Sequence, residues 1–171
     1  MDVRLAAMSK RDERNYAATP VDPEVARRIL DAGRVTSSAR NAQPWTFVIL
    51  ARPETREAAA ASVYVGRLVR DAGLAVALVV RPSGGLYLFD AGRAAQQMML
   101  VAWGEGLVSC PNGVGDPERL SAALGLDPEE RPVAVLTFGY PERPRRPERR
   151  SPEEWSARAR RRPYDDVVRE A

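Results

Sequence analysis

The chain of 171 residues contains no histidine and only one cysteine, Cys110. Without histidine, the protein cannot build a histidine-based catalytic triad or the common zinc sites, and we expect no metal centre. A single cysteine cannot form a disulfide within the chain, which favours a reducing compartment. An enzyme of this composition must therefore take its chemistry from a bound cofactor or from carboxylates.

Long apolar runs are also missing, so no segment predicts a membrane span. The first residues, Met1 to Arg4, lack the basic and then apolar layout of a signal peptide. Together with the lone cysteine, this predicts a cytoplasmic protein with no membrane contact. The hydrophobic content of 44% and the charged content of 29% are typical of a globular domain with a sizeable core.

Lysine is almost absent, since Lys10 is the only one, whereas 10 arginines fall within residues 141–171. A basic tail can indicate binding to nucleic acid, to an acidic protein surface or to phosphate. Seven acidic residues interleave with these arginines, which favours a solvated helix with ion pairs over a nucleic-acid arm. We therefore expect no nucleic-acid partner.

The apolar periodicity and the positions of glycine and proline predict alternating helices and strands. Helices are expected at 2–10, 23–34, 54–70, 87–104, 117–124 and 151–160, and strands at 45–51, 74–80, 107–110 and 132–141. Asp22 as N-cap and Pro23 at the first helical position mark the start of one helix. The continuous apolar run 74–80 predicts a central strand. Residues 1–141 are expected to form the core domain, and residues 142–171 an Arg/Pro-rich C-terminal arm.

Residues 37–50 run from a polar loop of small residues directly into an apolar strand. The polar side chains of the loop are those of Ser37, Ser38, Asn41 and Gln43. A loop of hydroxyl and amide groups on a rigid scaffold can bind a small polar ligand. The alternative is an ordinary helix-to-strand loop, in which Pro44 ends the turn and Trp45 packs in the core.

This segment resembles the signature of the FMN-dependent nitroreductase family, P-S-x-x-N-x-Q-P-W followed by an apolar strand. The matching residues are Ser38, Asn41, Gln43, Pro44 and Trp45. Ser37 stands where the family usually has proline. The resemblance implies the α+β class and a three-layer α-β-α sandwich, with a central mixed sheet flanked by helices. It also implies a homodimer with FMN at the subunit interface, contacted by Ser37, Ser38, Ala39, Asn41 and Gln43, and a C-terminal arm over residues 142–171 that packs on the partner subunit.

Residues 10–16 resemble the family motif R-R-S-x-R-x-[FY], which holds the FMN phosphate. Lys10, Arg11 and Arg14 can supply the charged donors that a phosphate needs. Asp12 departs from the motif, because a carboxylate beside a phosphate is repulsive by about a kcal/mol unless an arginine neutralises it. A charged helix end is the alternative interpretation.

Three further segments extend the resemblance. A tail arginine two residues before a proline also reaches the phosphate in the family. Arg161 fits this pattern best and Arg150 is its competitor, with solvated surface as the alternative for either. Residues 106–113 resemble the strand along one edge of the flavin, which places Asn112 and Gly113 at that edge. Residues 90–100 resemble a core helix of the dimer, and Cys110 is expected to be a buried, inert thiol.

The resemblance implies an oxidoreductase in which hydride passes from NADH or NADPH through flavin N5 to an oxidised small-molecule acceptor, such as a nitroaromatic or a quinone, in ping-pong order. No side chain needs to act as a nucleophile. Asp12 and Ser37 leave open a flavin-binding or sensing protein without efficient turnover. A specialised branch, such as a dehalogenase, a flavin-destroying enzyme or a heterocycle oxidase, and an Arg-rich interaction module are further alternatives.

Overall fold

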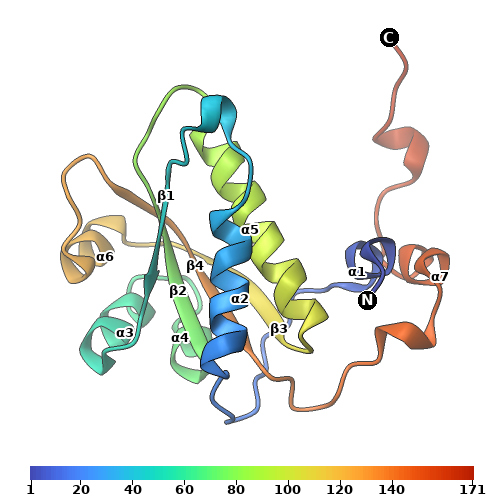
Figure 1. The fold of residues 1–171 in the computed structure, drawn as a ribbon, viewed down its shortest axis with the longest axis horizontal. Coiled ribbons are helices and arrows are strands. Elements are labelled where there is room, and N and C mark those ends of the chain that lie inside the picture. Colours follow the sequence, from blue (N-terminus) through green and yellow to red (C-terminus); the bar gives the residue numbers. More distant parts are fainter. The chain divides into compact units, whose positions relative to one another are not determined.

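The computed structural model describes all 171 residues, and the chain divides into two compact units. The larger unit consists of residues 11–145, and the smaller one combines residues 1–10 with residues 146–171. The elements of the larger unit are α2 (Pro23–Arg34), η1 (Ala39–Asn41), β1 (Trp45–Ile49), α3 (Pro53–Ala60), α4 (Gly66–Asp71), β2 (Leu74–Val80), α5 (Tyr87–Gly104), β3 (Val108–Gly113), α6 (Pro117–Leu124) and β4 (Arg131–Gly139), as Figure 1 shows. Those of the smaller unit are α1 (Val3–Ser9), η2 (Pro147–Arg149), α7 (Pro152–Ala157) and η3 (Tyr164–Asp166).

Four strands form one sheet in the order β1-β2-β4-β3, and every neighbouring pair runs antiparallel. The α+β class expected from the sequence is confirmed. We expected a mixed sheet, but the four strands are paired only antiparallel. The one parallel pairing is the isolated bridge between Asp12 and Ser109. All seven residues of β2 are buried, as predicted for a central strand.

The connection between β1 and β2 explains their antiparallel pairing. A single helix over residues 54–70, as we expected, would carry the chain across the sheet to a parallel strand. Two short helices, α3 and α4, are found instead, and the chain re-enters the sheet at the end where it left. The backbone N–H of Leu50 accordingly donates to the carbonyl oxygen of Ala75 (2.9 Å). The two helices pack closely at the break. Only glycine fits at position 66, because a Cβ there would collide with the carbonyl oxygen of Ala60.

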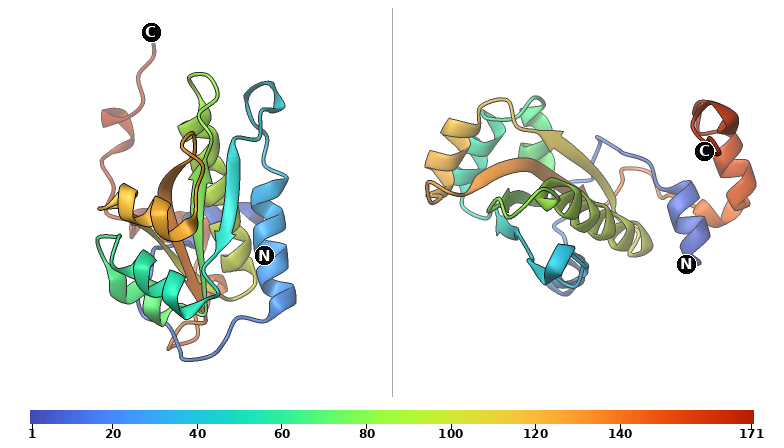
Figure 2. Two further views of the ribbon diagram at one scale, coloured as in Figure 1. Left: turned by 90° about the vertical axis from the view of Figure 1, so that its left-hand side faces the viewer. Right: turned by 90° about the horizontal axis from the view of Figure 1, so that it is seen from above.

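Helices cover both faces of the sheet, so the three layers expected from the sequence are confirmed (Figure 2). Helices α2 and α5 pack together on one face, and α3, α4 and α6 lie on the other. The core beneath α2 and α5 contains Ile29, Met98 and Phe138, all fully buried. Gly33 allows the two helices to approach, because a Cβ there would lie 2.7 Å from the Sδ of Met98.

Local signals place most element ends where the sequence predicts them. Helix α2 has the predicted bounds, and Oδ1 of Asp22 accepts the N–H groups of Glu24 (2.8 Å) and Val25 (3.3 Å) at its start. Helices α5 and α6 and strand β2 also have the predicted bounds. Strand β3 continues to Gly113, beyond its expected end at residue 110, and α7 is shorter than the expected 151–160.

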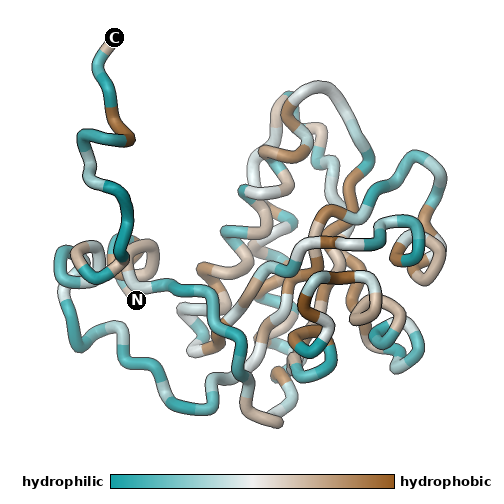
Figure 3. Tube along the Cα trace, turned by 180° about the vertical axis from the view of Figure 1, so that it is seen from behind, coloured by the Kyte–Doolittle hydropathy of each residue, from teal (hydrophilic) through white to brown (hydrophobic).

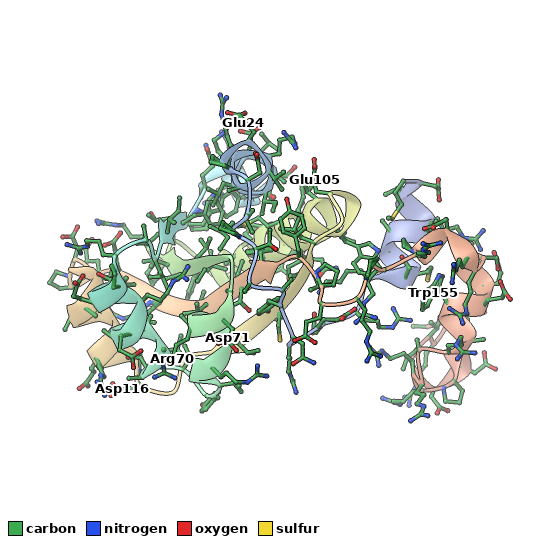
Figure 4. The ribbon with its side chains drawn as sticks, turned by 90° about the horizontal axis from the view of Figure 1, so that it is seen from below. Glu24, Arg70, Asp71, Glu105, Asp116 and Trp155 are labelled. Atoms are coloured by element: carbon green, nitrogen blue, oxygen red, sulfur yellow. The ribbon has the colours of Figure 1, made fainter.

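In the smaller unit, α1 packs against α7. Arg4 and Glu153 form an ion pair across the two helices (2.6 Å). The indole N–H of Trp155, labelled in Figure 4, donates to the carbonyl oxygen of Pro147 (2.9 Å). The first ten residues thus share a unit with most of the expected C-terminal arm. Figure 3 shows that this arm is largely hydrophilic, whereas apolar residues follow the strands of the larger unit.

The only cysteine, Cys110, is buried in β3, as expected, and its thiol donates to the carbonyl oxygen of Pro111 (3.5 Å). No helix combines the length and the apolar character that crossing a lipid bilayer requires. No group of three or more histidine, cysteine, aspartate or glutamate side chains is gathered closely enough to hold a metal ion.

Candidate functional site

The polar loop before β1 has an unusual backbone. Arg40, Asn41 and Gln43 have positive φ angles of 54°, 55° and 46°. For Arg40 and Gln43 this left-handed conformation costs roughly 1–2 kcal/mol each, whereas asparagine adopts it more readily. The strain is held by local bonds, since Ser38 accepts the N–H of Gln43 at its Oγ (2.9 Å) and the N–H of Asn41 at its carbonyl oxygen (3.0 Å). Ser37, Ala39, Asn41 and Gln43 are exposed and Ser38 is half-buried.

A buried carboxylate ties this loop to α5. The backbone N–H of Ala39 donates to Oδ2 of Asp90 (2.8 Å), and Asp90 is only 3% exposed. Its other oxygen, Oδ1, lies 3.3 Å from Nη1 of Arg93. Asp90 also stands in the first turn of α5, where the helix dipole favours a negative charge. The sequence pointed to residues 90–100 as a structural helix but did not reveal that Asp90 holds the loop.

Pro44 and Trp45 connect the loop to the sheet. Pro44 is buried, and its carbonyl oxygen accepts the N–H of Arg81 (2.9 Å). The Trp45 ring lies 6.5 Å from that of Phe47 in a stacked arrangement and packs against the core. The core role that we considered for Trp45 is therefore present, and it fixes the base of a loop whose tip remains exposed.

Residues 11–16 are anchored differently, by the sheet itself. Asp12 pairs with Ser109 of β3, and the N–H of Glu13 donates to the carbonyl oxygen of Ser109 (3.1 Å). The Tyr16 hydroxyl is hydrogen-bonded to Oγ1 of Thr137 (2.7 Å). Burial raises the pKa of Tyr16 to about 12, although the bond to Thr137 partly opposes this shift. The segment that carries Arg11 and Arg14 is thus fixed along β3 and β4.

A further arginine joins this segment from α4. Nη2 of Arg67 donates to the carbonyl oxygen of Arg14 (3.2 Å), and Nη1 bonds Asp71 (2.9 Å), which is labelled in Figure 4. Arg11 is half-buried and Arg14 is exposed. The sequence contains no motif that marks Arg67, because only the folded chain places it beside residues 14 and 15.

The other predicted phosphate ligands belong to the smaller unit. The guanidinium of Arg150 stacks on the ring of Trp155, with 5.1 Å from its Cζ to the ring centroid. Nη1 of Arg161 donates to the carbonyl oxygen of Ala159 (3.0 Å). Lys10 is the last residue of the N-terminal segment of this unit. Contact of these three cations with a phosphate stays a prediction.

At the predicted flavin edge, Asn112 uses its side chain internally. Its Nδ2 donates to the carbonyl oxygen of Val65 (2.8 Å) and its Oδ1 accepts the N–H of Val65 (3.2 Å). The side chain of Asn112 is therefore engaged within the chain, its backbone is paired with Val135 of β4, and its contact with a flavin stays a prediction. Gly113 has a reason to be glycine within the chain, because a Cβ there would lie 2.9 Å from Cε2 of Tyr64.

The predicted site residues of the larger unit thus form two groups. The loop group, residues 37–43, is tied to the first turn of α5, and the edge group, centred on residues 11–14, is tied to β3 just after α5 ends. Asp90 and Gly104 are 14 residues apart on that helix, which corresponds to about 20 Å. Figure 1 shows the loop group at one end of α2 and α5 and the start of β3 near the other end.

The chain is similar to known proteins in both sequence and fold. The family model described as Nitroreductase family matches residues 7–81 and 86–140. An NADH dehydrogenase of Thermus thermophilus is 31% identical over 190 residues, which cover 89% of this chain and 93% of that protein. A nitroreductase family protein of Clostridium difficile has a similar structure, with a TM-score of 0.82 and 24% identity over 99% of this chain and 98% of that one. An FMN-dependent nitroreductase from another strain of this species has a TM-score of 0.74 and 19% identity, covering 82% and 88% of the two chains.

Proposed function

The chain belongs to the nitroreductase family, and on this premise we propose that it is an FMN-dependent oxidoreductase. It takes hydride from NADH or NADPH and passes it to an oxidised small molecule, such as a nitroaromatic or a quinone. The names of two similar proteins support the proposal: one relative is called an NADH dehydrogenase, and one protein of similar fold an FMN-dependent nitroreductase.

The separation of the two groups of site residues carries the proposal. The loop is anchored at the start of α5, and the segment of Arg11 and Arg14 is anchored on β3 just after the end of α5, so that about 20 Å of helix lies between the two anchor regions. We propose that two copies of the chain share the ligand, with the loop of one subunit facing the edge group of the other. The exposed side chains of Leu86, Leu88 and Phe89 at the start of α5 support a subunit contact there.

The residues present fit a planar, phosphorylated cofactor. Ser37, Asn41 and Gln43 are exposed and carry the donors and acceptors that a polar ring edge and a hydroxylated chain require. Arg11 and Arg14 supply guanidinium groups for a phosphate, and Arg67 adds a third beside them. Asp12 and Glu13 are the residues of opposite charge within this segment. Glu13 is paired with Arg145, and the three arginines offset the repulsion of Asp12.

In this mechanism, bound FMN supplies the hydride chemistry, and the chain supplies binding and orientation. The strained backbone of residues 40–43 presets the donors of the loop, so little entropy is lost when the ligand binds. Arg11 and Arg14 hold the phosphate end, and no side chain acts as a nucleophile. One open site can then receive the nicotinamide and the acceptor in turn, which gives ping-pong kinetics.

The visible spectrum of the purified protein tests the proposal. We expect a yellow protein that releases FMN on heating, as mass spectrometry can identify, and that is bleached within seconds by NADH or NADPH. A colourless protein that takes up no added FMN would overturn it. A protein that binds FMN but is bleached by neither nucleotide would instead be a flavin-binding or sensing protein, the alternative motivated by Asp12 and Ser37.

A further inference from the structure

Tyr64 lies in the connection between α3 and α4 and is 78% exposed, although its backbone is firmly held. Its N–H donates to the carbonyl oxygen of Gly113 (3.1 Å). The next residue, Val65, exchanges two hydrogen bonds with the buried amide of Asn112. On the other side, Ser62 accepts the N–H of Gly115 (2.8 Å). An exposed side chain thus projects from a segment that is fixed on both sides.

The ring of Tyr64 rests on two glycines. A Cβ on Gly113 would lie 2.9 Å from Cε2 and 3.0 Å from Cδ2 of the ring. A Cβ on Gly115 would lie 3.3 Å from Cε1 and 3.4 Å from Cδ1. Because opposite edges of the ring meet the two glycines, the ring spans both of them. Any side chain at Gly113 would force the ring to move away.

The rest of the ring has no partner within the chain. The Tyr64 hydroxyl makes no hydrogen bond to the protein, and no other aromatic ring stacks on it. A rigidly placed aromatic ring with an open face is suited to stacking on another planar ring, which is the preferred contact of such π-systems. A tyrosine places this surface with little loss of conformational entropy, since it has two side-chain torsions.

We propose that Tyr64 is a stacking platform that selects planar aromatic acceptors. This inference rests on the proposed function and on the predicted position of Asn112 and Gly113 at the edge of the flavin. The ring of Tyr64 lies directly on Gly113, so an acceptor stacked on it is held beside that edge. The hydroxyl, without an internal partner, is available to a nitro or carbonyl oxygen of the acceptor. Tyr64 is therefore a positioning residue for the acceptor and not a ligand of the cofactor.

Two substitutions test the platform, Tyr64→Leu, which removes the aromatic ring, and Tyr64→Phe, which keeps it. With 4-nitrobenzamide as a planar acceptor, we expect the KM to rise roughly tenfold in Tyr64→Leu and to change at most about twofold in Tyr64→Phe. With ferricyanide, which has no planar ring, both variants should match the wild type. The dissociation constant of FMN for the flavin-free protein, followed by quenching of flavin fluorescence, should be unchanged in both.

A second measurement does not depend on turnover. Calorimetric titration of the flavin-free protein with 4-nitrobenzamide should show weaker binding for Tyr64→Leu than for the wild type and for Tyr64→Phe. If the wild type binds FMN and is bleached, yet Tyr64→Leu equals it with 4-nitrobenzamide in both assays, the platform is wrong and the flavin function stands. If the wild type takes up no FMN, the flavin function fails, and the titration alone decides about the platform. If Tyr64→Leu lost equal activity with 4-nitrobenzamide and with ferricyanide, the role of Tyr64 would be merely structural, and the inference would be overturned.

Discussion

The loop group and the edge group of the candidate site are held in place by opposite means. Residues 37–43 keep a strained, left-handed backbone through hydrogen bonds within the loop and one bond to Asp90. Residues 11–16 are instead paired with β3, and the buried Tyr16 locks them to β4. Loss of the anchor of the edge group should therefore cost mainly fold stability, whereas loss of the tether of the loop group should cost mainly ligand affinity.

The largest effect is expected for Tyr16→Ala. Tyr16 is 8% exposed, and its ring packs so closely on β4 that a Cβ on Gly139 would lie 2.9 Å from it. Loss of a buried aromatic ring costs about 4 kcal/mol of the free energy of unfolding, which urea denaturation measures. Tyr164→Ala, at a tyrosine that is 74% exposed, is the control and should cost less than about 0.5 kcal/mol. Equal losses in the two variants would show that Tyr16 does not anchor its segment.

The raised pKa of Tyr16 gives the next effect. The phenol has a pKa of about 12 in the folded chain, compared with its ordinary value of 10.0, because burial disfavours the charged form. The folded state thus favours the neutral phenol, and this stabilisation is complete below pH 10 and is lost as the pH rises through 12. The loss should reach about 2 kcal/mol at pH 12.

Denaturation curves at increasing pH measure this loss. Tyr16→Phe has no ionisable group at this position, so its free energy of unfolding should fall less steeply over the same range. Parallel pH profiles for the wild type and Tyr16→Phe would contradict the assignment of the pKa shift to Tyr16.

The two groups also differ in how much of each could be predicted from sequence. The hydroxyl and amide residues of the loop lie within one short segment, and their cap and strand signals are local, so the loop and the bounds of α2 follow from the sequence. The break between α3 and α4 does not, because residues 61–63 carry no strong breaker and the close packing at Gly66 is a tertiary contact. Asp90, Arg67 and Tyr64 gain their places by the same kind of contact. Of these three residues only Asp90 has a signal in the sequence, namely a carboxylate in the first turn of a largely apolar helix.

Removing the bond between Asp90 and the loop group should lower stability less than Tyr16→Ala does. It should lower the affinity for FMN more. In Asp90→Ala, the N–H of Ala39 loses its charged acceptor and Arg93 its partner, which costs about 2 kcal/mol. We expect the affinity for FMN to fall at least about tenfold as the loop loses its preset form. Asp90→Asn keeps an acceptor oxygen and should therefore retain part of the stability and part of the affinity for FMN.

Asp31→Ala is the matched control for Asp90→Ala. Asp31 is an exposed carboxylate that pairs with Arg34 on the same helix (2.7 Å), so its removal should cost only about 0.3 kcal/mol. Flavin fluorescence and urea denaturation measure the two quantities. Unchanged FMN affinity in Asp90→Ala would show that the loop keeps its form without the tether.

The smallest predicted effect is a gain in stability, opposite in sign to the losses above. It concerns the strained backbone of the loop group. Arg40 has a φ of 54°, which glycine adopts without penalty, so Arg40→Gly should raise the free energy of unfolding by about 0.5 kcal/mol after the extra chain entropy of glycine is subtracted. Ala42 in the same loop has an ordinary right-handed φ of −68°, and Ala42→Gly should therefore lower stability by roughly 0.5–1 kcal/mol. Opposite signs in the two variants would show that strain is stored at Arg40. If Arg40→Gly also weakens FMN binding, the stored strain is what presets the loop for its ligand, whereas a gain in stability with unchanged affinity would make the strain incidental to binding.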